Sequence, residues 1–112
     1  MSIKTDKWID DHKQELIEWT RGICRIPSVQ GEPVEANPAG SVPPSPFGVK
    51  VREAEDLMIK VAKDECGFDP VDGNGYYAYV DAGEEEGKTK EMLGIICHLE
   101  VVPEGTGWDY PA

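Results

Sequence analysis

The chain has 112 residues, 39% of them apolar, and 11 basic against 22 acidic side chains give it a net charge of −11. This length fits one small domain, and so acidic a surface argues against nucleic acid or anionic membranes as partners while attracting cations. No apolar run approaches the roughly 18 residues of a membrane helix. The N-terminus "MSIKTDKWIDDHKQ" also lacks the apolar core of a secretory signal.

The first predicted element is an amphipathic helix over residues 4 to 26. Asp6 is a suitable N-cap for it, and Pro27 ends it because the residue before a proline is pushed out of the α region. Residues 27 to 46 then form a long loop rich in proline and glycine, and loops of this length are usually functional or disordered. The helical stripe is formed by Trp8, Ile9, His12, Leu16, Trp19 and Ile23, which recur at spacings of three and four.

A second helix is expected from Phe47 to Glu65, where Gly67 can end it in the left-handed conformation. Its apolar face comprises Val51, Ala54, Leu57, Met58, Val61 and Ala62. A turn at "DGNG" leads into a short strand in which Tyr77 and Tyr79 share one face.

The charged stretch "EEEGKTK" follows as a surface turn whose glutamates are expected to be solvated. "EMLGIICHLE" then predicts the last strand. Its run Met92 to Cys97 lacks polar alternation, as in a central strand covered on both faces. The order helix, helix, strand, strand predicts an α/β fold. Two strands and two helices make a poor independent domain, so the chain resembles the front end of something larger.

The three cysteines, Cys24, Cys66 and Cys97, are odd in number and widely spaced. They form no Cys-x-x-Cys pair and no evident disulfide framework. The pattern favours reduced thiols in a cytoplasmic protein, with each cysteine packed as a small apolar residue.

One of the two histidines, His98, ends the most apolar run of the chain. Residues two apart on a strand share a face, so His98 and Glu100 point the same way while Cys97 and Leu99 point the other way. Ligand sites of open α/β sheets lie at the carboxyl ends of strands. A neutral imidazole there can bind zinc while a carboxylate holds its other nitrogen. From the residues alone, His98 is either such a ligand or an ordinary histidine at a strand end, and the second reading is the commoner case.

The segment "HLEVVPEGTGW" resembles the His-x-Asp-Val-Val-Pro segment of the zinc aminopeptidase, carboxypeptidase and aminoacylase family. Within that family the resemblance is nearest to the bacterial PepV-type (Xaa-His) dipeptidases. "ICRIPSV", "PFGVKVREAEDLMIKVAKDECGFDPVDGNGYYAYVDAGE" and "LGIICHLEVVPEGTGWDYP" extend it in order over nearly the whole chain.

This resemblance implies the N-terminal portion, residues 1 to 112, of a catalytic domain whose mixed sheet is sandwiched by helices. The rest of that domain and the family's second domain are absent from the 112 residues. The complete family enzyme is cytosolic, carries two zinc ions with a bridging water, and acts on dipeptides or N-acyl amino acids. A zinc-bound water has its pKa lowered toward about 7, which supplies hydroxide at neutral pH.

His98 maps onto the family's first metal-ligating histidine, and Glu100 stands where the family has the aspartate that orients it. The extra carbon–carbon bond of Glu100 is about 1.5 Å long, so we expect a different rotamer and local repacking. The family's remaining ligands lie downstream of Ala112, so at most one partial zinc site is expected and the chain alone should be inactive. His12 lies on the helical stripe and is not expected to replace them.

The alternative is a non-catalytic acidic interaction or regulatory module derived from such a peptidase. Under either hypothesis, uncovered strands invite self-association. The module should melt cooperatively as a soluble oligomer, whereas a bare fragment should fold poorly or aggregate.

Overall fold

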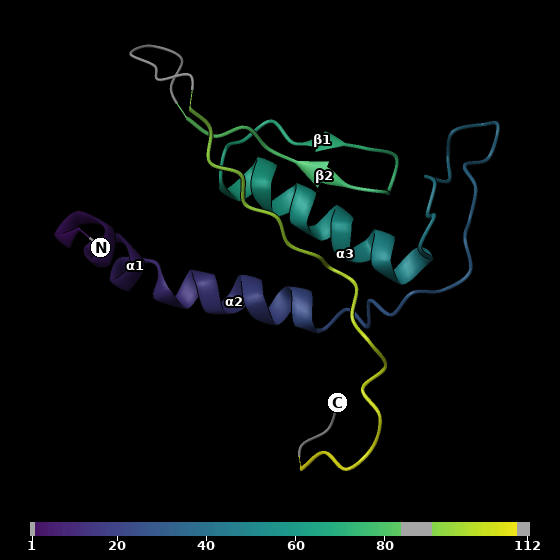
Figure 1. The fold of residues 1–112 in the computed structure, drawn as a ribbon, viewed down its shortest axis with the longest axis horizontal. Coiled ribbons are helices and arrows are strands. Elements are labelled where there is room, and N and C mark those ends of the chain that lie inside the picture. The colour runs from purple at the N-terminus through teal and green to yellow at the C-terminus, as the bar shows by residue number, and fades with distance from the viewer. Residues whose placement is uncertain (1, 84–90, 110–112) are drawn as a thin grey trace.

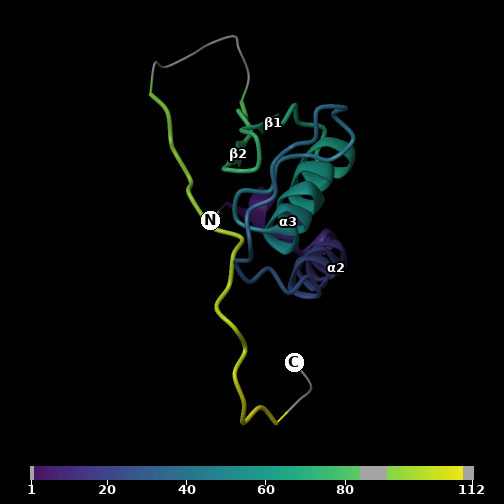
Figure 2. The ribbon, with the colours of Figure 1, turned by 90° about the vertical axis from the view of Figure 1, so that its right-hand side faces the viewer.

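The computed structural model describes residues 2–83 and 91–109. Figure 1 shows α3 (Val49–Lys60) lying between α2 (Lys13–Cys24) on one side and a small hairpin on the other, and the turned view in Figure 2 keeps this order. No helix among the described residues is long and apolar enough to cross a membrane. The elements are α1 (Ile3–Asp11), α2 (Lys13–Cys24), α3 (Val49–Lys60), the π-helical turn η1 (Val61–Glu65), β1 (Val71–Asp72) and β2 (Ala78–Tyr79).

The predicted first helix is present but is divided at His12 into α1 and α2. The His12 ring stacks on Trp8 with ring centroids 4.0 Å apart, and its Nδ1 lies 2.8 Å from the Trp8 carbonyl oxygen. The prediction that Asp6 is the N-cap of this helix was wrong. Ser2 takes that position because its hydroxyl accepts a hydrogen bond from the Thr5 N–H at 3.2 Å. The helical run ends before Pro27, as predicted.

The second helix starts two residues later than predicted, after Gly48, and continues through η1 to Glu65. Gly67 follows it with a φ of 71°, which confirms the left-handed end. Val51 and Ala54, on the predicted apolar face, are the only buried apolar side chains among the described residues. Both lie on α3, which packs against α2.

The hairpin contains one strand that was predicted and one that was not. β1 and β2 are antiparallel, with Val71 opposite Tyr79 and Asp72 opposite Ala78. The turn between them places Asn74 and Gly75 at positive φ, 60° and 81°. The Tyr77 and Tyr79 rings stack, with centroids 6.4 Å apart, so these two side chains do share a face.

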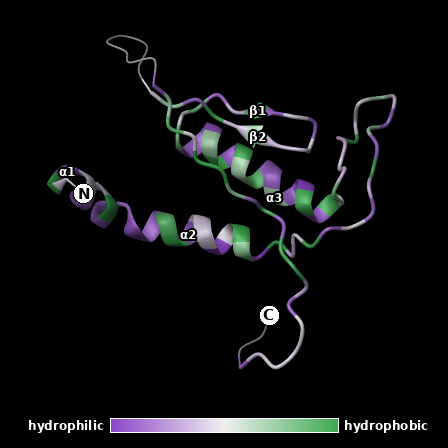
Figure 3. Cartoon of the chain, viewed as in Figure 1, coloured by the Kyte–Doolittle hydropathy of each residue, from purple (hydrophilic) through white to green (hydrophobic). Residues whose placement is uncertain are grey.

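The predicted last strand is wrong for the described structure. Residues 91–100 contain no strand, and Met92, Leu93, Ile95 and Ile96 are 86–97% exposed. A strand needs neighbours to satisfy its backbone groups, and no backbone hydrogen bond joins residues 91–97 to another described residue. Figure 2 shows this extended segment, in yellow-green, running apart from the helices, and Figure 3 shows its apolar stretch in green.

Three related expectations have different outcomes. The cysteines are free, as predicted, but Cys24, Cys66 and Cys97 are exposed rather than packed in a core. The predicted surface turn at residues 84–90 lies outside the described residues. The mixed sheet between helices stays a prediction, because the described part of the chain contains only the two-stranded sheet.

Candidate functional site around His98 and Glu100

His98 and Glu100 meet although their segment is not a strand. The His98 Nδ1 lies 3.0 Å from the Glu100 carboxylate Oε2 and 2.9 Å from the Glu100 carbonyl oxygen. Both neighbours are acceptors, so Nδ1 must carry the proton that they share. In the neutral ring the lone pair is then on Nε2, and the His98 side chain is 79% exposed. This arrangement leaves Nε2 available to bind a metal or accept a proton.

The segment that carries the pair is anchored at one place to the loop after α2. The Ser28 hydroxyl donates to the Leu99 carbonyl oxygen at 2.6 Å, and the Val101 N–H donates to the Ser28 carbonyl oxygen at 3.0 Å. Val29 and Val101 form an isolated parallel bridge at the same point. The long loop at residues 27–46 therefore does reach the candidate site, through its first residues.

The donor set at this site is one imidazole and one carboxylate. Within residues 2–83 and 91–109, no group of three or more His, Cys, Asp or Glu side chains is arranged to hold a metal ion. A catalytic zinc needs three protein ligands, so the described residues do not by themselves fit such a site. His12 is engaged with Trp8. The roles of His98 as a metal ligand and Glu100 as a catalytic carboxylate stay predictions.

A second polar cluster, which the sequence did not reveal, joins α3 to the hairpin. The Arg52 guanidinium makes two parallel hydrogen bonds to the Asp72 carboxylate, one of them 3.0 Å long from Nη1 to Oδ1. Asp56 Oδ1 lies 2.9 Å from Arg52 Nη2, and Glu55 Oε2 lies 3.7 Å from Nη1. The Gly75 N–H also donates to Asp72 at 3.1 Å. The only available signal was an arginine followed by carboxylates at i+3 and i+4.

The pKa shifts of the residues in this cluster differ in direction and in cause. The hydrogen bonds from Arg52 hold the pKa of Asp72 below its ordinary range, and Asp72 in turn raises the pKa of Arg52. Burial raises the pKa of Glu55, which is only 5% exposed, and the attraction of Arg52 offsets this in part. Glu55 Oε1 and Arg52 Nε are buried without a hydrogen-bond partner among the described residues. We interpret the cluster as structural, since it connects α3 to the hairpin.

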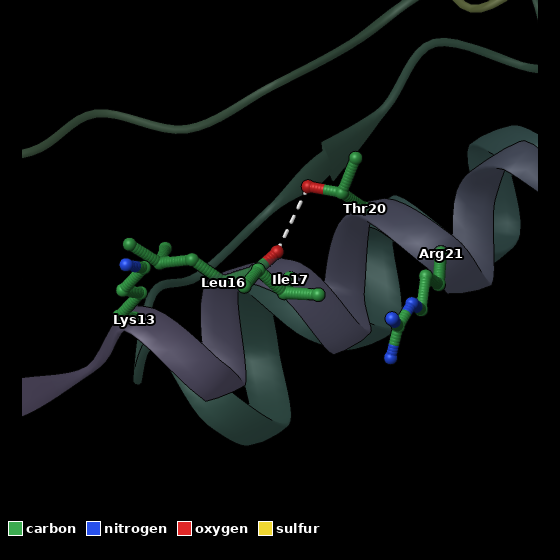
Figure 4. A pocket seen from close by; sticks show the side chains of 5 residues that line it. All are labelled: Lys13, Leu16, Ile17, Thr20 and Arg21. Carbon is green, nitrogen blue, oxygen red and sulfur yellow. Dashed lines mark hydrogen bonds between the residues drawn. The ribbon is translucent and has the colours of Figure 1, made fainter.

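Two surface depressions lie on the first two helices. Figure 4 shows an open depression of about 300 Å³ along α2, lined by Lys13, Leu16, Ile17, Thr20 and Arg21. The Thr20 hydroxyl that borders it donates to the Leu16 carbonyl oxygen at 2.8 Å, a bond within the helix. A second depression, of about 540 Å³, lies on α1. Neither contains His98 or Glu100, so neither adds to the candidate site.

Comparison with known proteins points to peptidases. The chain is 33% identical over 99 residues to a Staphylococcus epidermidis protein named "Putative dipeptidase", and 33% identical over 102 residues to a Staphylococcus saprophyticus protein of the same description. A Staphylococcus aureus protein so described is 32% identical over 101 residues. These matches cover 88–90% of this chain but 19% of each relative. The chain therefore spans about a fifth of the length of these relatives. No protein-family model and no solved structure matches it.

Proposed function

We propose that the chain is the N-terminal portion of a zinc-dependent dipeptidase that hydrolyses dipeptides or N-acyl amino acids. The observation that carries the proposal is the contact between His98 and Glu100, which leaves His98 Nε2 free. Its support is the similarity to dipeptidase-named proteins over nearly all of the chain. In this proposal His98 contributes one metal ligand, and Glu100 holds the ring through Nδ1. The other ligands come from outside these 112 residues, so the chain alone does not hydrolyse dipeptides.

A chimera tests this proposal. The matching fifth of the Staphylococcus epidermidis relative is replaced by this chain, and zinc-dependent hydrolysis of a dipeptide panel is measured. The chimera should be active, and His98→Ala should lower kcat/KM at least about 100-fold, the upper range for losing a partner that supports a metal ligand. His12→Ala is the matched control, because His12 contacts Trp8 instead of Glu100. An inactive chimera, or full activity of His98→Ala, would overturn the proposal.

Glu100→Asp in the same chimera examines the one departure from the family motif. The shorter side chain matches the aspartate of the family segment that this chain resembles. We expect activity equal to or above that of the Glu100 chimera, whereas Glu100→Ala should be impaired. Equal activity with Glu, Asp or Ala at position 100 would show that Glu100 has no role in the site.

A second candidate function rests on the exposed apolar segment. Four side chains between Met92 and Ile96 are at least 86% exposed, and such patches mark interaction surfaces. A non-catalytic interaction module would cover them with a partner or a second copy. A soluble oligomer of defined size in light scattering would favour this function, and a chain without a defined oligomeric state would favour the dipeptidase portion.

A further inference from the structure

Ser28 is one of four buried polar or charged residues in the part of the chain that the structure describes. It is 3% exposed and lies just beyond the end of α2, in the segment that leads from the packed helices into the long loop. Both of its hydrogen-bonding oxygens are directed at one short stretch of chain, residues 99 to 101. A buried hydroxyl and a carbonyl from one residue thus hold the two peptide groups that flank Glu100.

The geometry of the second peptide group connects Ser28 to His98. In a planar trans peptide the N–H and C=O point in opposite directions. The Val101 N–H is held by the Ser28 carbonyl oxygen at 3.0 Å. The carbonyl of the same peptide, that of Glu100, is therefore turned away from Ser28, and this is the oxygen 2.9 Å from His98 Nδ1.

The first peptide group completes the anchor. The Ser28 hydroxyl donates to the Leu99 carbonyl oxygen at 2.6 Å. With both flanking peptides held, the backbone on either side of the Glu100 Cα is fixed, and so is the direction in which the Glu100 side chain leaves it. The carboxylate Oε2 that also contacts His98 Nδ1 starts from this fixed point.

We propose that Ser28 is a positioning residue for the His98–Glu100 pair, which sets the proton on His98 Nδ1 and the lone pair on Nε2. This inference rests on the proposed function only for its consequence, since the ring geometry exists in the chain without any substrate. Ser28 touches no reacting atom. It acts through the Glu100 carbonyl and the backbone that carries the Glu100 side chain.

The test compares the imidazole nitrogens of the 112-residue chain by long-range ¹⁵N–¹H correlation at pH 8, together with amide exchange at Val101. His12 provides a reference within the same molecule, because its Nδ1 also lies 2.8 Å from a carbonyl oxygen but far along the chain from Ser28. Ser28→Ala removes the hydroxyl, and Ser28→Thr retains it. Ser45→Ala is the matched control. Ser45 is equally buried, at 4%, but its hydroxyl reaches only Pro43, at 3.5 Å.

The wild-type chain should show His98 as the Nδ1–H tautomer and a protected Val101 amide. Ser28→Ala removes the hydroxyl bond to the Leu99 carbonyl oxygen but keeps the Ser28 carbonyl that holds the Val101 N–H. The loosened Leu99–Glu100 peptide should shift His98 toward a mixture of tautomers and speed Val101 exchange by up to about 10-fold, the upper range for the loss of one hydrogen bond. The His12 tautomer should not change in any variant. Ser28→Thr should keep the His98 tautomer and the Val101 exchange rate of the wild type. A mixed His98 tautomer in the wild type would overturn the proposal, as would an equal shift in Ser45→Ala or no shift in Ser28→Ala. An inactive chimera with these signals intact would instead reject the proposed function and leave the positioning role standing.

Discussion

Arg52 and Asp72 lie twenty residues apart in the sequence and join α3 to the hairpin through a two-pronged ion pair. The guanidinium is nearly buried, with 10% of its side chain exposed, while Asp72 keeps 35%. Such bidentate pairs are directional as well as strong. The pair therefore fixes the orientation of the hairpin on a helix that has few buried apolar contacts.

Asp72→Asn is expected to lower the free energy of unfolding by about 1–2 kcal/mol, because it leaves the Arg52 guanidinium short of a charged partner. The partial exposure of Asp72 keeps the loss in the lower part of the usual range. Urea unfolding followed by circular dichroism measures it. Asp69→Asn is the control, since Asp69 is exposed and takes part in none of the ion pairs between described residues. Equal stability of the two variants would contradict the structural role of the pair.

Glu55 is expected to make the protein less stable as pH rises above 4.5, the ordinary pKa of a glutamate. Its pKa is raised by burial, so the folded state binds a proton that the unfolded state has already released. The contribution is fully present below pH 4.5 and is lost as pH rises through the higher pKa of the folded state. The pKa of Asp72 is lowered, so its contribution is lost only as pH falls below about 3.8.

The difference in unfolding free energy between wild type and Glu55→Gln isolates this effect when it is followed from pH 4 to pH 8. The wild type should lose stability relative to the variant across that range. Glu53→Gln on the exposed side of the same helix should show no such trend, because the Glu53 side chain is 51% exposed. Parallel curves for wild type and Glu55→Gln would show that the burial of Glu55 has no energetic consequence.

Gly75→Ala should destabilise the hairpin turn by about 2 kcal/mol or more. Gly75 has a φ of 81°, where a side chain costs roughly 1–2 kcal/mol. A Cβ there would also lie 2.6 Å from the Pro44 carbonyl oxygen. Gly94→Ala is the matched control, because a Cβ at Gly94 meets nothing within 4 Å among the described residues. Thermal melts of the two variants should differ by several degrees, and coincident melts would refute the described turn.

Ile96→Lys is expected to reduce self-association without lowering stability, because Ile96 is 97% exposed within a continuous apolar stretch. Static light scattering over a concentration series measures the effect. Ile3→Lys changes an equally apolar side chain that is 89% exposed but lies on α1, away from that stretch. If both lysines reduce association alike, net charge rather than this segment controls it.

The helices could be predicted because their pattern is local. Val51 and Ala54 repeat at helical spacing, and both are buried in the structure. The division at His12 could not be predicted in the same way. It depends on a ring that both stacks on Trp8 and reaches the Trp8 carbonyl, and no periodicity encodes that contact.

The same distinction applies to the candidate site, whose local contacts could be predicted from the sequence while its long-range contacts could not. Contact between His98 and Glu100 follows from a separation of two residues, which an extended backbone places on one side. The anchor at Ser28 joins residues 71 positions apart, so the sequence offered only a long loop of unknown destination. The error at Met92 to Cys97 has a related cause. An apolar run indicates only that its side chains favour burial. A strand also requires adjacent chain segments that hydrogen-bond to its backbone N–H and C=O groups.

The separation of 71 residues between Ser28 and Leu99 also sets when the site can form. Closing so large a loop costs more entropy than closing the turns of α2, α3 or the hairpin, and only a few hydrogen bonds offset this cost. During synthesis the helices and the hairpin can assemble while residues 98 to 101 are still inside the ribosome. The contacts that hold His98 and Glu100 to Ser28 are therefore expected to form after the helices and the hairpin, and to open before them when the chain is perturbed.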